Sequence, residues 1–237
     1  MKYYLIAGEA SGDLHGSNLM KGILKADPGA RFRFWGGDKM AAVGGAENLA
    51  MHYEKASFMG FTEVLKNLRT IFGQIEQCKR DVAAYAPDVL VLIDYAGFNL
   101  RLARFGRERG IPTYYYIAPK VWAWKESRVK KIRRWVDRLF VIFPFEVEYF
   151  RRRGIEAIYE GNPLMDAIDA RRAALGSKEE FRAVHGLDGR PVVACLAGSR
   201  RRSATICRSW SSCRGGFRSI SSSWRACRGS TARSTSR

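Results

Sequence analysis

A carboxylate that follows a buried strand is the best-placed candidate for acid–base chemistry in this chain. Asp94 comes directly after the apolar run "DVLVLI", which is typical of a strand buried in a parallel sheet. Ligands of α/β proteins bind at the carboxyl ends of such strands, where a carboxylate can take a proton from a substrate hydroxyl. The alternative is that Asp94 caps the next helix, and the residues leave both interpretations open.

Turns of small residues are a second feature that could bind a ligand or take part in catalysis. The segment "AGEASGD" at Ala7–Asp13 lies between an apolar run and a helical pattern, so its backbone N–H groups can approach a ligand. Ser11 can cap the helix or donate to a substrate oxygen. A similar turn, "AGSR", ends at Arg200, whose guanidinium suits a diphosphate. The geometry of the fold alone explains such turns equally well, and Arg200 could be a solvated residue of an arginine run.

Two segments combine apolar or aromatic residues with cations. Apolar residues within Phe61–Ile75 recur at helical spacing, with Phe58 and Met59 before them and cations beside them. This pattern indicates either a helix packed on a sheet or an interfacial helix on anionic lipid. The segment Lys120–Arg138 mixes cations with Trp122, Trp124 and Trp135. This mixture suits lipid headgroups, a sugar phosphate or single-stranded nucleic acid, and no nucleic-acid fold signature supports the last.

The residues that could ligate a metal are scattered. His15, His52 and His185 are far apart in the sequence, and Cys78 and Cys195 are the only cysteines before the last 35 residues. We therefore expect no metal site and no cofactor, and we expect the histidines to be structural or at the surface.

Alternating strands and helices must position these groups. Six apolar runs predict strands, namely "KYYLIAG", "RFRFWGG", "DVLVLID", "PTYYYIA", "DRLFVIFPF" and "IEAIYEGNP". Helical patterns separate them, notably at Phe61–Gln77, Leu100–Arg109, Lys125–Trp135 and Glu146–Arg153. This order predicts an α/β fold with a Rossmann-like parallel sheet and helices on both faces. The run "PVVACLAGSR" then looks like the first strand of a second, truncated Rossmann-like domain.

Charge and composition change sharply near Arg202. The 237 residues carry a net charge of +18, and nine arginines with no lysine or acid lie in 201–237. This tail has too few aliphatic residues to fold, so it indicates either a shifted reading frame, which we favour, or a basic arm for nucleic acid. We predict an acceptor-side domain over 1–165, a linker and the start of a nucleotide-sugar domain over 166–202, and a disordered tail over 203–237.

Several motifs occur together in a specific order: "AGEASGD", "IDYAGFN", "YIAPKVWAWKESRVKKI", "EGNPLMDA" and "LAGSR". Together they resemble lipid-A-disaccharide synthase, an inverting glycosyltransferase family with two Rossmann-like domains in the GT-B arrangement. The resemblance covers Met1 to about Arg202 and ends at the tail. It implies that the first domain is the N-terminal half of a GT-B protein.

The resemblance also implies a reaction and its residues. The family transfers 2,3-diacylglucosamine from UDP-2,3-diacylglucosamine to 2,3-diacylglucosamine 1-phosphate and releases UDP, so the UDP-sugar is a substrate and not a cofactor. Asp94 takes the catalytic position, and Gly97 stands where the family often has a second acid. The implied substrate-binding residues are Glu9, Ser11, Gly12, Asp13, Asn99, Trp122 and Lys125. The implied donor-phosphate residues are Gly198, Ser199 and Arg200, and the implied lipid contacts are Phe58, Met59, Phe61, Val64, Leu65, Leu68 and Phe72.

The resemblance and the moderately basic body imply a location. No apolar run approaches the roughly 20 residues of a spanning helix, and the sequence begins directly with a strand-like run. We expect a cytoplasmic protein, peripheral on the anionic inner face of the inner membrane, with no nucleic-acid partner. Because most of the donor domain is missing, we expect this chain to be nearly inactive.

Two other functions remain open at this point. Another GT-B enzyme, such as a UDP-N-acetylglucosamine epimerase, would not depend on acyl chains. A non-catalytic basic module would bind nucleic acid through its arginine-rich arm in a salt-sensitive way.

Overall fold

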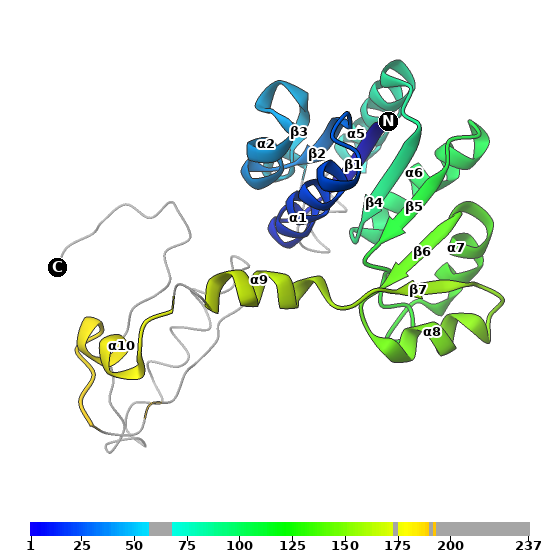
Figure 1. Cartoon of the computed structure of the whole chain (residues 1–237). Helices are drawn as coiled ribbons and strands as arrows, with labels where there is room; N and C mark the ends of the chain where they lie inside the picture. The colour runs from blue at the N-terminus through cyan, green and yellow to red at the C-terminus, as the bar shows by residue number, and fades with distance from the viewer. Residues whose placement is uncertain (57–67, 173–174, 190–191, 193–237) are drawn as a thin grey trace. The chain divides into compact units, whose positions relative to one another are not determined.

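A seven-stranded parallel sheet forms the centre of the protein. The structure is a computed structural model that describes residues 1–56, 68–172, 175–189 and 192. Figure 1 shows the sheet, whose strand order is β3-β2-β1-β4-β5-β6-β7. The strands are β1 (Lys2–Ala7), β2 (Arg31–Gly36), β3 (Leu49–His52), β4 (Val89–Ile93), β5 (Thr113–Tyr116), β6 (Arg138–Val141) and β7 (Ala157–Tyr159). All six neighbouring pairs are parallel.

Helices lie on both faces of this sheet, as the sequence predicts. The longer helices are α1 (Ala10–Ala26), α2 (Asp38–Gly44), α5 (Leu68–Tyr85), α6 (Ala96–Glu108), α7 (Val129–Trp135), α8 (Pro144–Arg151) and α9 (Pro163–Arg172). The short ones are α3 (Tyr53–Ala56) and the 3-10 turns η1 (Ala46–Asn48) and η2 (Glu126–Arg128). Buried residues of α1 and α2 pack on one face, and those of α5 to α8 pack on the other. The α/β Rossmann-like fold is therefore confirmed.

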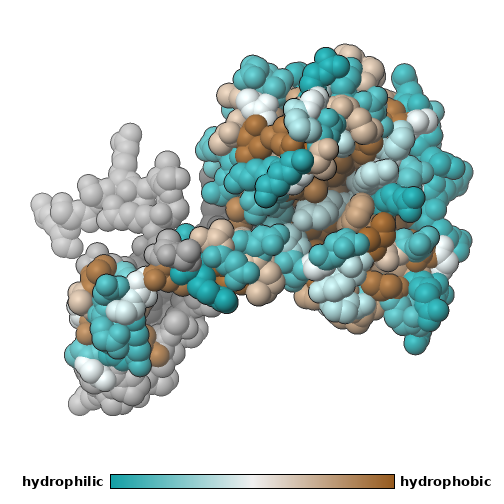
Figure 2. Space-filling view, in the orientation of Figure 1, coloured by the Kyte–Doolittle hydropathy of each residue, from teal (hydrophilic) through white to brown (hydrophobic). Residues whose placement is uncertain are grey.

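Burial along the strands follows from these two helical layers. All five residues of β4 are buried, because helices lie on both of its faces. In β5 the pattern alternates: Thr113 and Tyr115 are buried, whereas Tyr114 and Tyr116 are half-buried. The α5–α8 face thus covers β5, while the α1–α2 face covers it only in part. Figure 2 shows small apolar patches between polar residues on the face of the molecule seen there.

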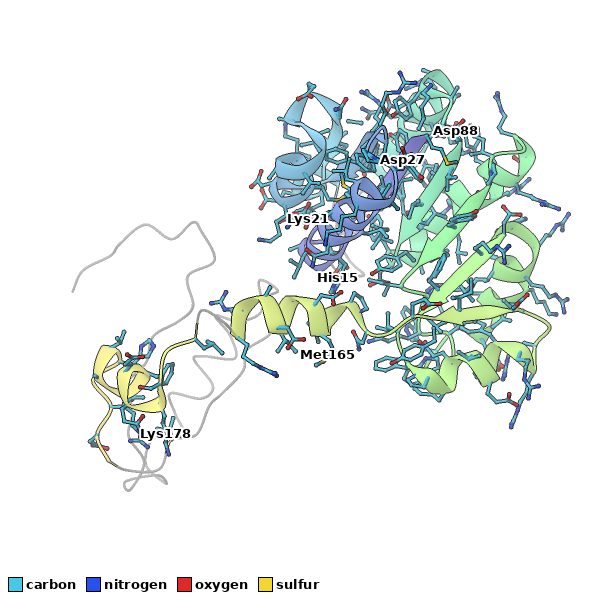
Figure 3. The ribbon with its side chains drawn as sticks, viewed as in Figure 1. His15, Lys21, Asp27, Asp88, Met165 and Lys178 are labelled. Carbon is cyan, nitrogen blue, oxygen red and sulfur yellow. The ribbon has the colours of Figure 1, made fainter. Side chains whose placement is uncertain are left out.

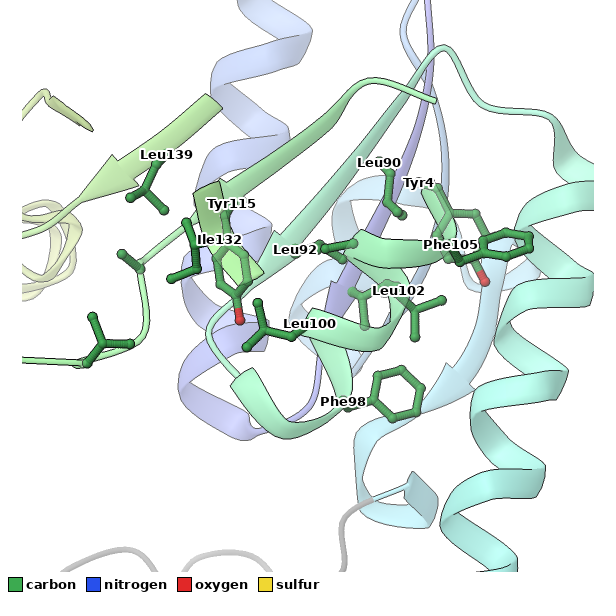
Figure 4. Packing of buried hydrophobic residues seen from close by; sticks show 14 of the residues in the cluster. Tyr4, Leu90, Leu92, Phe98, Leu100, Leu102, Phe105, Tyr115, Ile132 and Leu139 are labelled. Atoms are coloured by element: carbon green, nitrogen blue, oxygen red, sulfur yellow. The ribbon is translucent and has the colours of Figure 1, made fainter. Parts of the chain in front are cut away.

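The larger core lies between the sheet and helices α5 to α8. Figure 4 shows Leu90 and Leu92 of β4 beside Leu100, Leu102 and Phe105 of α6, all in one buried cluster. Burying each of these side chains contributes about 1.5–3 kcal/mol to folding. Because β4 and α6 share this cluster, the short turn that connects them is held between two well-packed elements.

Some elements differ from the expectation. Strand β3 and helix α2 were not predicted, because "LAMH" is short and the glycines around it read as a loop. Helix α5 ends at Tyr85 and not at Gln77, and α7 begins at Val129 after the η2 turn. The first part of the expected helix Phe61–Gln77, residues 61–67, lies outside the described residues.

The chain divides into two compact units, Met1–Asp169 and Ala170–Arg237. In the described part of the second unit, α10 (Lys178–Val184) begins with a capping box. The N–H of Glu180 donates to Ser177 Oγ at 3.1 Å, and the N–H of Ser177 donates to Glu180 Oε2 at 2.7 Å. The predicted domain limits stay predictions.

Candidate functional site

The carboxyl ends of β1 and β4 meet where the strand order reverses. The two strands are neighbours in register, with Ala7 opposite Ile93, so the residues that follow them lie at the same edge. From β1 the chain continues to β2 and β3 on one side, and β4 to β7 lie on the other. Such a switch point is where open α/β sheets bind ligands. The Gly8–Asp13 turn and Asp94 both lie there.

Asp94 occupies an unusual backbone conformation at this edge. Its side chain is exposed, and its φ is +45°. Tyr95 follows with φ +45° and ψ +49°, so two successive non-glycine residues are left-handed. Each such residue costs roughly 1–3 kcal/mol. Helix α6 has Tyr95 and not Asp94 as its N-cap residue, which leaves the carboxylate at the solvent side of the turn.

Glycine is required in the turn after β1. A Cβ at Gly8 would lie 2.3 Å from Cδ1 of Tyr95, and one at Gly12 would lie 3.1 Å from Cβ of Ala7. The ring of Tyr95 therefore lies directly on the backbone of Gly8, and α1 packs closely against β1. The sequence signal of small residues here reflects close packing at the edge of the sheet.

Acidic and hydroxyl residues of the same turn divide into accessible and buried groups. Glu9 is half-exposed at the N-cap of α1, and Ser11 is exposed in the first turn. Asp13 is 3% exposed, and its carboxylate accepts N–H groups of Gly37 at 2.7 Å, Met40 at 3.0 Å and Lys39 at 3.1 Å. These contacts hold the start of α2. Of the predicted substrate-binding residues in this turn, the structure exposes Glu9 and Ser11, and it buries Gly12 and Asp13.

Asn99 is another buried member of the predicted set. It is 0% exposed, and its Nδ2 lies 2.8 Å from the carbonyl oxygen of Asp94 and 3.1 Å from that of Ile93. In this structure Asn99 contacts the backbone of the turn that carries Asp94. Its predicted role in substrate binding stays a prediction.

His15 lies at the site, although the sequence analysis expected it to be structural or at the surface. Figure 3 labels His15 near the amino end of α1. Burial lowers the pKa of His15, while the negative charges of Asp166 and then Asp94 act to raise it. Among the described residues, its buried Nδ1 has no hydrogen-bond partner. A usable signal was present, because His15 follows Ser11 by four positions and therefore shares its side of the helix.

The first turn of α9 brings a further carboxylate to this edge. Asp166 lies in that turn, and its charge acts on both His15 and Tyr116. Burial is the main cause of the raised pKa of Tyr116, with Asp166 as the second. The motif "EGNPLMDA" therefore supplies one acidic group beside the Asp94 turn.

An aromatic–cationic cluster lies on the segments that follow β5 and β6, including η2 and the start of α8, at the same edge. Its residues are Lys120, Trp122, Trp124, Lys125, Arg128, Phe143 and Phe145. Trp124 is 58% exposed, with the ammonium of Lys125 4.8 Å and the guanidinium of Arg128 5.1 Å from its ring centre. Trp122 is also exposed, and its Nε1 donates to the buried carboxylate of Glu146 at 2.9 Å. The structure therefore fixes Trp122 and presents cations and aromatic rings together.

The predicted lipid-contact residues fall mostly outside the described residues. These are Phe58, Met59, Phe61, Val64 and Leu65, and only the backbone of Leu68 is described. Phe72 is 51% exposed, with the guanidinium of Arg101 5.3 Å from its ring centre, whereas Ile75 of the same helix is buried in the core. Helix α5 thus packs on the sheet and leaves Phe72 outside. Gly198, Ser199 and Arg200 also lie outside the described residues.

The described ranges contain neither a metal-binding cluster nor a membrane-spanning helix. Within them, no group of three or more His, Cys, Asp or Glu side chains could hold a metal ion. In those ranges, no helix has both the length and the apolar character to span a bilayer. The expectation that no cofactor is needed stays a prediction.

Solved structures with the same fold include sugar-nucleotide enzymes. A UDP complex of the Staphylococcus aureus protein MnaA matches with a TM-score of 0.61 at 12% identity, over 92% of this chain and 61% of that one. A UDP-GlcNAc 2-epimerase from Neisseria meningitidis matches with a TM-score of 0.54 at 12% identity, over 81% of this chain and 56% of that one. At this identity the likeness shows the fold alone.

The sequence relatives have a much higher identity to this chain than these solved structures do. The family model "LpxB: Lipid-A-disaccharide synthetase" matches residues 3–210. The lipid-A-disaccharide synthases of Geobacter metallireducens and Syntrophus aciditrophicus are 43% and 39% identical to this chain over 198 and 202 residues. These matches cover 83% and 85% of this chain, and 50% and 51% of the relatives, so the chain spans about half the length of the curated relatives it matches. The chain belongs to the lipid-A-disaccharide synthase family of glycosyltransferases.

Proposed function

We propose that this chain carries the acceptor side of lipid A disaccharide synthesis. The observation that carries the proposal is Asp94, an exposed carboxylate at the switch point of the sheet, beside the accessible Glu9 and Ser11. In this role the chain binds 2,3-diacylglucosamine 1-phosphate and directs its 6-hydroxyl towards Asp94. Family membership and the fold of sugar-nucleotide enzymes support this assignment.

The proposed reaction needs one base and one leaving group. The 6-hydroxyl oxygen attacks the anomeric carbon of UDP-2,3-diacylglucosamine, and Asp94 accepts the hydroxyl proton. The bond from that carbon to the diphosphate breaks, and UDP leaves with the electron pair. Gly198, Ser199 and Arg200 are the proposed donor-phosphate residues, because an arginine fork complements a diphosphate. A general base of this kind contributes about 10²–10⁴-fold to a rate.

The aromatic–cationic cluster supports the proposed partners. Its cations suit the 1-phosphate of the acceptor or anionic headgroups, and its exposed tryptophans suit a membrane interface. We propose a peripheral association with the inner face of the inner membrane through this surface. Co-sedimentation with phosphatidylglycerol vesicles tests it: the chain should sediment at low salt, and the double substitution of Trp124 and Lys125 by Ala should reduce the bound fraction. Equal sedimentation of both would contradict this surface.

Substitution of Asp94 tests the catalytic assignment. Asp94→Asn should lower disaccharide formation from both substrates by about 10²–10⁴-fold while acceptor binding in mixed micelles is retained. Asp88→Asn, at the opposite end of β4, is the matched control and should leave turnover unchanged. Because the chain spans half of its relatives, acceptor binding is measured beside turnover. A chain that binds no acceptor, or an Asp94→Asn variant with full turnover, would refute the proposal.

A further inference from the structure

The backbone of Asp94 and Tyr95 needs external support. Both residues have φ +45°, and neither is glycine. Contact between Cβ and the neighbouring carbonyl disfavours this conformation for L-residues, and runs of two are rarer than single cases. Such a turn persists only where surrounding contacts hold it, and these contacts are therefore worth identifying.

Asn99 provides the first support from inside α6. Its Nδ2 lies 2.8 Å from the carbonyl oxygen of Asp94, 3.1 Å from that of Ile93 and 3.5 Å from that of Ile6. The side chain is fully buried, and within the described part of the chain its Oδ1 has no hydrogen-bond partner. A buried acceptor without a partner is unfavourable. The amide of Asn99 therefore contacts the turn through its Nδ2, although this leaves the buried Oδ1 in an unfavourable position.

Tyr115 provides the second support from β5. Its hydroxyl donates to the same carbonyl oxygen of Asp94 at 2.6 Å. Burial raises the pKa of the Tyr115 phenol well above its usual value, so the group remains a donor throughout the working pH range. A carbonyl oxygen has two lone pairs and can accept both donors. Side chains from α6 and β5 therefore converge on one backbone atom of Asp94.

We propose that Asn99 and Tyr115 are positioning residues, which fix the backbone of Asp94 so that its carboxylate stays at the switch point. The proposal rests on the proposed function of Asp94 as the base. Donors from two different elements thus hold the carbonyl oxygen of Asp94. Loss of one donor lets the turn relax towards ordinary backbone angles and moves the carboxylate away from the acceptor hydroxyl. Misplacement of a reacting group by about 1 Å can lower a rate up to a hundredfold.

Removal of one hydroxyl tests this proposal with little change in packing. Tyr115→Phe keeps the buried ring, and Tyr114→Phe removes the neighbouring hydroxyl on the opposite face of β5 as the control. The expected result is a fall in kcat of about fivefold or more with KM nearly unchanged in Tyr115→Phe, and no change in Tyr114→Phe. Asn99→Ala removes the other donor and should act in the same direction, with its folding checked by circular dichroism. Equal kcat in Tyr115→Phe and the wild type would overturn the proposal.

A double substitution separates positioning from a general structural effect. Combined with Asp94→Asn, Tyr115→Phe should cause no further loss of turnover, because the group it positions is already removed. The same fold-loss in both backgrounds would show that Tyr115 acts independently of Asp94 and would refute the proposal.

Amide hydrogen exchange gives a readout that does not depend on turnover. The N–H of Asp94 donates to the carbonyl oxygen of Tyr116 at 3.2 Å, and it should exchange faster in Tyr115→Phe than in Tyr114→Phe. Unchanged exchange would overturn the positioning role. A wild-type chain that binds no acceptor would count against the proposed function alone, since the exchange comparison still decides whether the donors hold the turn.

Discussion

The two faces of the sheet differ in how far their helices reach. On the α5–α8 face, buried side chains extend from Trp35 in β2 to Ala157 in β7. On the α1–α2 face, the described residues are buried over β1, β2 and β4, whereas Tyr116 and Phe140 are only half-buried. Asp94 follows β4, the last strand that both layers cover. The proposed base is therefore attached to a strand that is buried on both faces, directly beside a part of the sheet that is less covered.

Neighbouring residues of β6 give the largest expected contrast between the faces. Leu139 is 1% exposed on the α5–α8 face, so Leu139→Ala should lower the free energy of unfolding by about 2–4 kcal/mol. Phe140 is half-buried on the other face, so Phe140→Ala should cost about 1–2 kcal/mol despite its larger side chain. Equilibrium urea unfolding measures both. A larger loss for Phe140→Ala would show that this face is covered in solution.

The contact between α1 and α2 should have the next largest effect. Asp13→Ala removes the acceptor for three backbone N–H groups at the start of α2 and should cost about 2–3 kcal/mol. Asp38→Ala is the control, because this carboxylate is fully exposed on the same helix, and it should change stability by less than about 0.5 kcal/mol. Thermal unfolding of the two variants checks the prediction. Equal losses would mean that the backbone of α2 finds other partners.

Substitution of His15 should give the smallest effect, which is a change in how the stability of the fold depends on pH. Its pKa is lowered in the folded state by burial, so between that value and about 6.5 the unfolded chain binds more protons. Stability should therefore fall as pH decreases below about 6.5, and the wild type should lose stability relative to His15→Gln over that range. Denaturant midpoints at pH 7.5 and 5.5 provide the measurement, with His52→Gln on β3 as the control. Parallel curves for the wild type and His15→Gln would exclude this contribution.

Sequence patterns predicted the elements whose burial is continuous. The run "DVLVLI" identified β4, because a strand covered on both faces has no polar positions. The position of Asp94 at the carboxyl edge followed from that strand. Strand β3 was not predicted, because its four residues are all half-buried and apolar and polar positions do not alternate along it.

Contacts between distant residues could not be read from the sequence. The partners of Asp13 lie 24 to 27 residues away, so its capping of α2 depends on how α1 and α2 meet. The left-handed turn at Asp94 was equally hidden, because neither Asp94 nor Tyr95 is glycine. His15 was expected to be structural or at the surface because it is isolated in the sequence, and only the fold brings the charges of Asp94 and Asp166 to it.

The missing side chain at Gly8 has a mechanical consequence. Because the ring of Tyr95 rests on this backbone, the loop after β1 and the residue next to Asp94 cannot shift independently. A larger residue at position 8 would therefore have to push that ring aside, and the ring belongs to the residue next to the acid.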